Sequence, residues 1–533
     1  MSEPPPAAAE AEPSAARSLS PEFNPLGPTA GGHAQRLARG AVLQQGAQVA
    51  RLVGGFFVIT VLAHRLSFAE LGTYTILLSL ITYVTFVKAS VMNAAVVGVA
   101  EAAGRGESER VSVIVSTAFA VYTVIGVISG VALCGLGLAL LPSLNIPHEL
   151  YHSAQLGVVG LAAVTLVSWP FQIFDDLLRG LQRFAAVSVL EITAMVAYVG
   201  GASALAFANA PVWSLVTLNA GIPLLMGLVC LLALRRLGIS VRVSRRLIER
   251  REARRFGSFS GLLVVSGVAD LATYSLDRFI LSALRSPAVV GRYEGPLGAQ
   301  NLIRYLNGVL NAPGIPVTAN FLAAGDRERV RELCLRALRY GFAATIPFVV
   351  VMIIYAGPVL ETWLGDRFGA VAAPAALFCS WWLVGANTGM VGMVLMGGRF
   401  TRQLVAVSWL GAVVNVALSI PLTSALGIYG PIIGSMSGFA ATLAFSFPFA
   451  MRVAGLRWRE VAREAWLPAY LTGAVLAAAL AGARYGLGLT SKPAVVAVLV
   501  LAPLLYWGLY ALVWLRADER ALALHAIGVR RGD

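Results

Sequence analysis

The sequence predicts an all-α fold, a polytopic membrane bundle of about fourteen transmembrane helices. Hydrophobic residues make up 58% of the chain and charged residues only 13%, about half of what a soluble domain carries. Fourteen apolar segments exceed the roughly 17 residues that a membrane-spanning helix needs. Lysine and arginine concentrate in every second loop, so the net charge of +14 reflects membrane topology and does not indicate nucleic-acid binding.

The apolar segments define the order of the elements. We expect spans at residues 42–63, 73–98, 112–141, 153–174, 185–207, 213–234, 257–284, 293–321, 338–364, 369–397, 404–424, 429–451, 466–485 and 494–515. The first six spans would form an N-lobe (41–234) and the next six a C-lobe (257–452), joined by a linker (235–256) that contains nine arginines. The last two spans (453–515) are an appendage, followed by a cytoplasmic tail (516–533).

The N-terminal segment and the loops define the orientation. Residues 1–40 are rich in Pro, Ala and Ser, which predicts a disordered cytoplasmic tail and not a cleavable signal peptide. With both termini in the cytoplasm, 31 lysines and arginines fall in inner loops and tails and only six in outer loops. This excess is typical of the positive-inside rule and supports that orientation.

The chain also contains an internal repeat. The same four residue types follow the first span and, 219 residues later, the seventh: Ser67, Ala69, Gly72 and Tyr74, then Ser286, Ala288, Gly291 and Tyr293. The next cytoplasmic loops, 102–111 and 323–330, correspond at a similar offset. The repeated offset predicts two pseudo-symmetric six-helix lobes related by an axis along the membrane normal.

Several short motifs occur in a fixed order over residues 36–455. They are Leu62-Ala63-His64-Arg65-Leu66 with 70–74, Arg179-Gly180-Leu181-Gln182-Arg183-Phe184, Asp277-Arg278 with 287–293, Gly411-Ala412-Val413-Val414-Asn415, and Leu426-Gly427-Ile428-Tyr429-Gly430-Pro431. In order and spacing they resemble the polysaccharide (Wzx-type, O-antigen) flippases of the multidrug/oligosaccharidyl-lipid/polysaccharide exporter superfamily. Two positions depart from that family: Lys88 stands where members often carry an acid, and His64 replaces the usual arginine.

The resemblance implies a V-shaped bundle whose two lobes enclose a cavity lined by spans 1, 2, 7 and 8, opening alternately to each side. It implies a transporter and not an enzyme, one that moves polyprenyl-diphosphate-linked oligosaccharide across the bacterial cytoplasmic membrane. The implied partners are this lipid-linked sugar, membrane lipids, and polysaccharide polymerase or assembly proteins.

Four cations lie inside the expected spans 1, 2, 7 and 8: Arg51, Lys88, Arg278 and Arg304. A charge at the bilayer centre costs roughly 2.5–3.5 kcal/mol, so such a residue normally faces a polar cavity. Arginine and lysine both donate charge-assisted hydrogen bonds to phosphate, so we expect the four to converge on one cavity that receives a diphosphate. The alternative is that each reaches an interface or pairs with an acid, as Arg278 would with Asp277 or Glu294.

Other polar residues in spans 7 and 8 are candidates for supporting roles. Asp270 and Asp277 lie seven residues apart on one helical face, where they would bind Na⁺ or a proton, or balance a nearby arginine. No other cofactor is expected. The candidate sugar contacts, for which helix packing is the alternative, are Gln300, Asn301, Asn307, Tyr274 and Tyr305.

No metal site is expected. His148-Glu149-Leu150-Tyr151-His152 matches the zinc-protease pattern H-E-x-x-H, but it lies in a short outer loop without a third ligand or a substrate cleft. The four cysteines are scattered and predict neither a disulfide framework nor a metal site.

Three other functions fit parts of the pattern. A lipid II flippase would use similar cations and the same number of spans. A multidrug cation antiporter would need an acidic cavity, whereas the four intramembrane cations outnumber Asp270 and Asp277. A membrane polymerase or glycosyltransferase would need a large outer loop, which the sequence does not contain.

Overall fold

The computed structural model describes residues 30–239, 241–258 and 261–515. Within these ranges every regular element is a helix, which confirms the predicted all-α class.

Seven helices make up the N-lobe: α1 Ala30–Arg65, α2 Phe68–Gly104, α3 Ser108–Leu140, α4 His148–Phe171, α5 Ile173–Gly180, α6 Phe184–Phe207 and α7 Val212–Arg236. A short 3-10 helix, η1 (Leu141–Leu144), follows α3. α4 and α5 form one span that is interrupted after Pro170, because proline cannot donate to the helical ladder. Residues 30–40 were expected in the tail but belong to α1.

The linker between the lobes contains η2 (Arg245–Leu247) and α8 (Arg250–Ser258). It is fixed to the N-lobe by ion pairs. Arg110 Nη1 lies 3.0 Å from Glu249 Oε2, and Arg110 also pairs with Glu252. Arg255 pairs with Glu101 at 3.2 Å. The arginine-rich linker is therefore attached to the end of α2 and the start of α3.

The C-lobe begins with α9 Gly261–Leu284, α10 Pro287–Asn311, α11 Gly314–Ala323 and α12 Arg327–Leu364. It continues with η3 Asp366–Val371, α13 Ala372–Ser380, α14 Trp382–Gly385, α15 Thr388–Gly397, α16 Thr401–Leu426 and α17 Tyr429–Ala454. The last two spans are α18 Trp458–Val461, η4 Ala462–Trp466, α19 Leu467–Ala481, η5 Gly482–Gly486 and α20 Lys492–Trp514.

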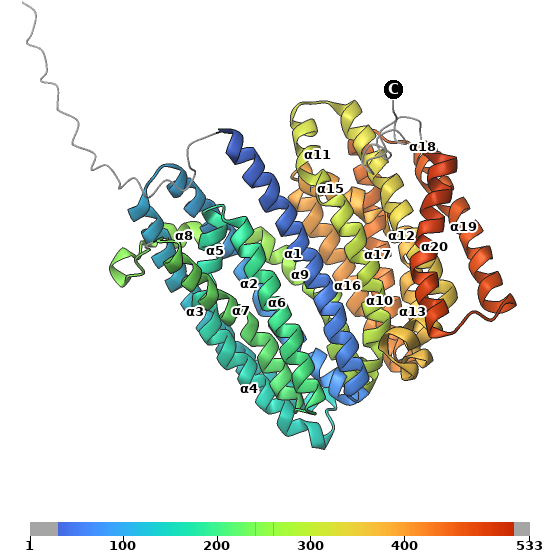
Figure 1. Ribbon diagram of the computed structural model, residues 1–533, viewed down its shortest axis with the longest axis horizontal. Helices are drawn as coiled ribbons and strands as arrows, with labels where there is room; N and C mark the ends of the chain where they lie inside the picture. Colours follow the sequence, from blue (N-terminus) through green and yellow to red (C-terminus); the bar gives the residue numbers. More distant parts are fainter. Residues whose placement is uncertain (1–29, 240, 259–260, 516–533) are drawn as a thin grey trace, which may run out of the picture.

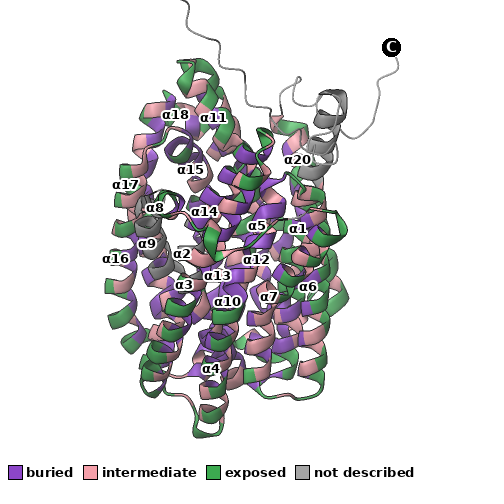
Figure 2. Cartoon of the chain, turned by 90° about the vertical axis from the view of Figure 1, so that its left-hand side faces the viewer, coloured by how far each residue is buried: buried purple, intermediate pink, exposed green. Residues whose placement is uncertain are grey.

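Each of the fourteen predicted spans overlaps one or more of these helices. In the described part of the chain, eleven helices are long and apolar enough to cross a membrane by length and composition. The other three predicted spans are α2, α9, and α10 with α11. Figure 2 shows buried residues concentrated on α10 and α12 in the middle of the bundle, and exposed residues on the outer faces of α6 and α16.

The two lobes lie side by side, and the start of α1 and the end of α20 lie at the same end of the bundle (Figure 1). We call this the basic end, because it also carries the arginine-rich linker. At the opposite end, here called the far end, α1 ends at Arg65 and α2 begins at Phe68. A capping box starts α2: Ser67 Oγ accepts from the Glu70 N–H, and the Glu70 carboxylate accepts from the Ser67 N–H.

The repeated motifs of the two lobes meet at the far end. A Cβ on Gly72 of α2 would lie 1.8 Å from the carbonyl oxygen of Pro287, the first residue of α10. Reciprocally, a Cβ on Gly291 of α10 would lie 2.1 Å from the carbonyl oxygen of Phe68. Each glycine therefore lets its helix approach the backbone of the opposite motif, and the pseudo-symmetry of the sequence appears directly in this contact.

Side chains reinforce the contact between the lobes toward the far end. The Trp363 indole donates to Thr60 Oγ1 at 2.8 Å, and its ring stacks on Phe56 with centroids 4.4 Å apart. Arg367 donates to the carbonyl oxygen of Leu66 and so satisfies a backbone acceptor just after the C-terminus of α1.

Toward the basic end, α10 leaves this packing. Between Val290 and Gln300 every residue except Arg292 and Gly298 is buried. Beyond that point large apolar side chains become exposed, among them Leu302 and Val309. The same occurs on the corresponding half of α1, where Val49 and Val53 are exposed. The lobes are thus closed together at the far end and separate toward the basic end.

Candidate functional site

Arg278 on α9 is paired and belongs to the contact between the lobes. It lies six residues before the far end of α9, hence about 9 Å from that end. Its Nε and Nη2 atoms donate to the two carboxylate oxygens of Glu294 on α10, at 2.6 and 3.0 Å. Nη1 lies 3.4 Å from Ser79 Oγ on α2. This bidentate pairing with Glu294 satisfies the guanidinium within the protein.

Arg304 lies deeper in the membrane, 17 residues into α10 and about 25 Å from its far end. It lines a cavity of about 230 Å³ in the C-lobe, together with side chains from α10, α14 and α15. Its guanidinium carbon lies 5.2 Å from the centre of the Tyr305 ring, in a cation–π contact.

Trp382 of α14 completes this cavity and was not foreseen from the sequence. It is 4% exposed, and its indole Nε1 is buried without a hydrogen-bond partner. A buried donor without an acceptor costs about 1–3 kcal/mol, so this N–H is suited to an incoming oxygen atom. Its sequence signal, a tryptophan beside another tryptophan in a span, does not distinguish it from a packing residue.

Two asparagines of α10 also border the C-lobe cavity. Asn307 Nδ2 donates to the carbonyl oxygen of Ala386 at 3.3 Å, which ties α10 to the segment between α14 and α15. Asn311 Nδ2 donates to the Asn307 carbonyl oxygen at 2.8 Å. A Cβ on Gly389 would lie 2.2 Å from Asn311 Nδ2, so this glycine makes room for the amide.

Arg51 lies in a different cavity, of about 210 Å³, in the N-lobe. It is 14 residues before the far end of α1, about 21 Å from it, so its depth is similar to that of Arg304. Its Nη1 atom lies 3.3 Å from Glu191 Oε1 on α6, and half of its side-chain surface stays exposed (50%). The exposed half leaves donors available to a ligand.

A chain of charges surrounds Arg51. Glu191 also accepts from Arg179 Nη2 at 2.6 Å, and Arg179 Nε donates to Asp175 at 3.2 Å. Two guanidinium groups and two carboxylates therefore alternate along one edge of the N-lobe cavity. The i, i+4 spacing of Asp175 and Arg179 is the only part of this network that the sequence signals.

Asp277 of α9 lies in a buried network of the C-lobe. It is 3% exposed, and its Oδ2 accepts from Tyr293 Oη at 2.7 Å and from Ser435 Oγ at 3.0 Å. Asn415 of α16 donates to Ser435 Oγ at 3.2 Å. The second carboxylate oxygen, Asp277 Oδ1, is buried without a hydrogen-bond partner.

The remaining predicted residues divide into two groups. Gln300 is buried on α10, Asn301 is half-buried and Tyr305 is exposed. The side chains of three others lie outside the described residues, although their backbones are helical: Lys88, Asp270 and Tyr274.

The expected single cationic cavity is not what the described residues form. Arg51 and Arg304 line separate cavities, one in each lobe, and Arg278 is paired with Glu294 near the far end. Carboxylates on other helices hold two of these arginines in place: Glu294, one of the acids that the sequence offered, pairs with Arg278, and Glu191, which no sequence pattern indicated, pairs with Arg51. Arg51 and Arg304 still share a depth, both in the half of the membrane nearer the basic end.

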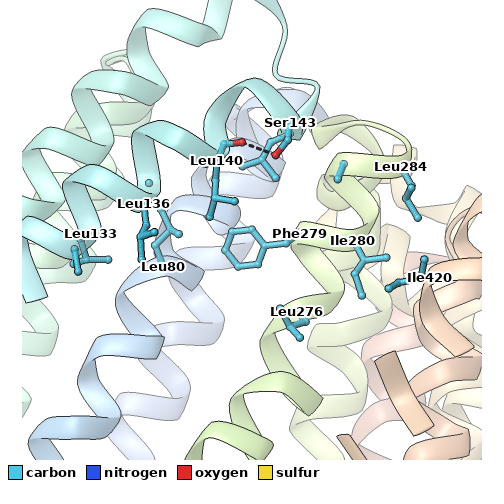
Figure 3. A pocket seen from close by; sticks show the side chains of 14 residues that line it. Leu80, Leu133, Leu136, Leu140, Ser143, Leu276, Phe279, Ile280, Leu284 and Ile420 are labelled. Carbon is cyan, nitrogen blue, oxygen red and sulfur yellow. Dashed lines mark hydrogen bonds between the residues drawn. The ribbon is translucent and has the colours of Figure 1, made fainter. Parts of the chain in front are cut away.

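A further cavity, of about 630 Å³, lies between the lobes (Figure 3). Leucine, isoleucine, phenylalanine, alanine and glycine form its walls, apart from Ser143. It therefore offers nothing to a charged or sugar headgroup. In the described part of the chain, no group of three His, Cys, Asp or Glu residues is placed to hold a metal ion.

Residues 61–373 match the model of a family described as polysaccharide biosynthesis protein. A protein of Bacillus subtilis (strain 168) described as the uncharacterized membrane protein EpsK is 24% identical over 200 residues. The matched segment covers 36% of this chain and 39% of EpsK, so the chain spans about two-fifths of that relative's length.

Solved structures share the fold at low identity. The lipid II flippase MurJ, in an inward closed conformation, superposes with a TM-score of 0.64 at 13% identity, over 90% of this chain and 100% of MurJ. A multidrug resistance MATE family transporter of the MOP superfamily, inward-facing, gives 0.61 at 15% identity, over 78% and 98% of the two chains. A MOP superfamily transporter from Pyrococcus furiosus gives 0.53 at 12% identity, over 82% and 99%.

These comparisons agree with the apolar helices and the two-lobe architecture. The family model covers more than half of the chain and confirms the resemblance based on the short motifs. The neighbours are multi-helix membrane transporters and flippases, as expected for a multi-pass transporter and not for an enzyme. The chain belongs to the polysaccharide biosynthesis protein family and has the fold of the MOP-superfamily membrane transporters.

Proposed function

We propose that this protein is a flippase that translocates polyprenyl-diphosphate-linked oligosaccharide across the bacterial cytoplasmic membrane by alternating access. Its role would be in surface polysaccharide biosynthesis, with the family and the fold as general support. The specific support comes from the C-lobe cavity, where Arg304 and the unpartnered indole N–H of Trp382 both border one space about 25 Å into the membrane.

The orientation follows from the positive-inside rule. The basic end carries the arginine-rich linker, the start of α1 and the end of α20, so it faces the cytoplasm in this proposal. The lobes are closed at the far end and separate toward the basic end, so with this orientation the conformation would be inward-facing. Arg51 and Arg304 then lie in the half of the membrane where a lipid made in the cytoplasm would load its headgroup.

The chemistry of loading is that of hydrogen bonds to phosphate. A diphosphate oxygen would accept from the Trp382 indole and from the Arg304 guanidinium, while the exposed half of Arg51 offers a second set of donors from the opposite lobe. Asn311 and Thr388 border the same C-lobe cavity and are suited to sugar hydroxyls. Binding one headgroup from both lobes would couple loading to their relative movement.

Asp277 is the proposed coupling group. A buried carboxylate oxygen without a partner is stabilised by a bound cation or by protonation, since either satisfies it. The contact of Asp277 with Tyr293 on α10 and Ser435 on α17 would transmit this event to two helices of the C-lobe. Asp270, on the same face of the same helix, stays a predicted second coupling group.

A lipid II flippase remains the chemically nearest alternative, because its cargo also carries a polyprenyl diphosphate. A cation antiporter is less consistent with the N-lobe cavity. Its two carboxylates, Asp175 and Glu191, are both engaged by guanidinium groups, so that cavity presents no net negative charge to a cationic drug.

The test measures cargo affinity and headgroup translocation in proteoliposomes that contain Arg304→Ala or Arg51→Ala. Arg292→Ala is the control. Arg292 lies on the same helix as Arg304 but is exposed at the far end. A charge-assisted hydrogen bond is worth about 1.5–3 kcal/mol, so each cavity variant should lower cargo affinity about ten- to a hundredfold. Arg292→Ala should bind as the unmodified protein does.

The cargo arms decide between the alternatives. Polyprenyl-diphosphate oligosaccharide, lipid II and a cationic dye are offered separately to the same vesicles. Preference for the first supports the proposal, whereas transport of lipid II alone or of the dye alone would replace it. Unchanged affinity in both arginine variants would show that the two cavities do not bind the headgroup.

A further inference from the structure

The apolar cavity between the lobes is a groove of about 630 Å³. Leu133, Leu136 and Leu140 of α3 form one wall, and Phe279 and Ile280 of α9 face them across the groove (Figure 3). The walls therefore come from both lobes, and the groove exists in this form only while the lobes are closed together at the far end.

Among the described residues that line the groove, none calls for a polar ligand. Its one hydroxyl, on Ser143, already donates to the Leu140 carbonyl oxygen at 2.7 Å. A water molecule needs two to four polar partners to be stable in a cavity, and these walls do not supply them. Only hydrocarbon can fill such a volume favourably within a membrane.

The far-end rim of the groove is closed by hydrogen bonds between the lobes. Asn145 Nδ2 donates to the carbonyl oxygens of Ser282 and Ala283, at 3.2 and 2.7 Å, and Ser282 Oγ donates to the Leu144 carbonyl oxygen. The groove is open sideways instead, since Leu136 on its edge is 65% exposed. α3 continues from there with exposed apolar residues such as Val131, which is a lipid-facing surface.

The length of the groove identifies its occupant. Its lining runs from Ala132 to Leu140 on α3 and from Leu276 to Leu284 on α9, about 12 Å along each helix. One leaflet contributes about half of the roughly 30 Å hydrocarbon core, which is close to this length. An acyl chain of one leaflet therefore fits, whereas a polyprenyl chain is longer than one leaflet and would leave much of its length outside.

We propose that this groove is a phospholipid site that holds one acyl chain of the leaflet nearer the far end, between α3 and α9. The chain completes the contact between the lobes in the closed far end and leaves when the lobes part there. The site is distinct from the headgroup cavities and does not depend on which cargo the protein carries.

The test uses the full chain in nanodiscs of phosphatidylethanolamine and phosphatidylglycerol, with a phospholipid that carries a diazirine on its acyl chain. After irradiation, mass spectrometry maps the labelled peptides. The α9 segment Leu276–Leu284 should be labelled. Leu136→Trp fills the groove and should reduce labelling of this segment to that of the lipid-facing surface. Ile128→Trp is the matched control, on the same helix and equally exposed at 63%, but outside the groove.

A second variant fills the groove at another residue, so that the result does not depend on whether Leu136→Trp folds. Leu284→Trp fills the groove from the other lobe and should cause the same loss. Equal labelling of α9 in the filled variants and in Ile128→Trp would show annular lipid only and overturn the proposal. Displacement of the phospholipid label by a polyprenol, without displacement by unlabelled phospholipid, would also overturn it, because the occupant would then be an isoprenoid.

Discussion

Replacing Gly72 by alanine tests whether the close approach of α2 and α10 holds the far end closed. The new Cβ would lie 1.8 Å from the Pro287 carbonyl oxygen, 2.7 Å from the Pro287 carbonyl carbon and 2.9 Å from the Gly291 nitrogen. All three are backbone atoms, so no side-chain rotation relieves the clash. The helices must move apart by more than an ångström, and that movement also separates Gly291 from Phe68.

The magnitude follows from the cost of overpacking. Inserting a methyl group into a tightly packed contact costs about 1–3 kcal/mol, and each 1.4 kcal/mol is a factor of ten in an equilibrium. The closed far end should therefore lose about five- to a hundredfold in population relative to the open one. We expect the loss as a shift in conformation and not as unfolding, because one cluster of buried residues lies within the N-lobe and its linker, and most of the other, which joins both lobes, comes from the C-lobe and the last two helices.

Distance distributions between spin labels on Asn209 and Leu426, exposed far-end sites of the two lobes, would report this shift by electron–electron double resonance. Gly308→Ala is the matched control on α10, since a Cβ there would meet nothing within 4 Å. A distribution for Gly72→Ala that coincides with that of Gly308→Ala would refute the role of this contact.

Three further outcomes are expected. Glu294→Gln should lower the melting temperature in detergent, because breaking a buried ion pair costs about 3–5 kcal/mol. Adding Arg278→Met should restore most of the lost stability. An unchanged melting temperature in Glu294→Gln would show that the pair does not stabilise the fold. Trp363→Phe removes the indole N–H that donates to Thr60 together with part of the ring, so it should cost at least about 0.5–1.5 kcal/mol in chemical denaturation; Thr60→Val should cost less in that background than alone, because the shared hydrogen bond is already lost, and equal costs would contradict this coupling. Asp277→Asn should abolish the response of transport to a Na⁺ or proton gradient while cargo still binds; a preserved response would remove Asp277 from coupling.

The spans and the repeat were predictable because they depend on local composition. A helix that crosses lipid must be largely apolar along its length, so each of the eleven helices of the described chain that are long and apolar enough to span is visible without knowledge of its neighbours. The start of α2 was also readable, since Ser67 and Glu70 form a capping box within four residues. The beginning of α1 at Ala30 was not, because a polar, alanine-rich segment is compatible with both tail and helix.

The pairing of charges was only partly predictable. Glu294 was one of two acids considered for Arg278, and the structure chooses it over Asp277. Adjacent residues on a helix point in different directions, so Arg278 cannot turn onto Asp277 as it does onto Glu294. Arg51 pairs with Glu191, 140 residues away, and no sequence pattern reports that contact.

The sequence by itself determined the class of protein, the positions of the long apolar helices, the basic end and the two-fold repeat, because hydropathy and charge act on each segment separately. Only the tertiary structure decided that Arg51 and Arg304 line separate cavities, that Arg278 is neutralised, and that Gly72 and Gly291 join the lobes. These features depend on which faces of distant helices meet. The effect of a buried charge or of a missing Cβ is set by the atoms opposite it, and those atoms come from other helices.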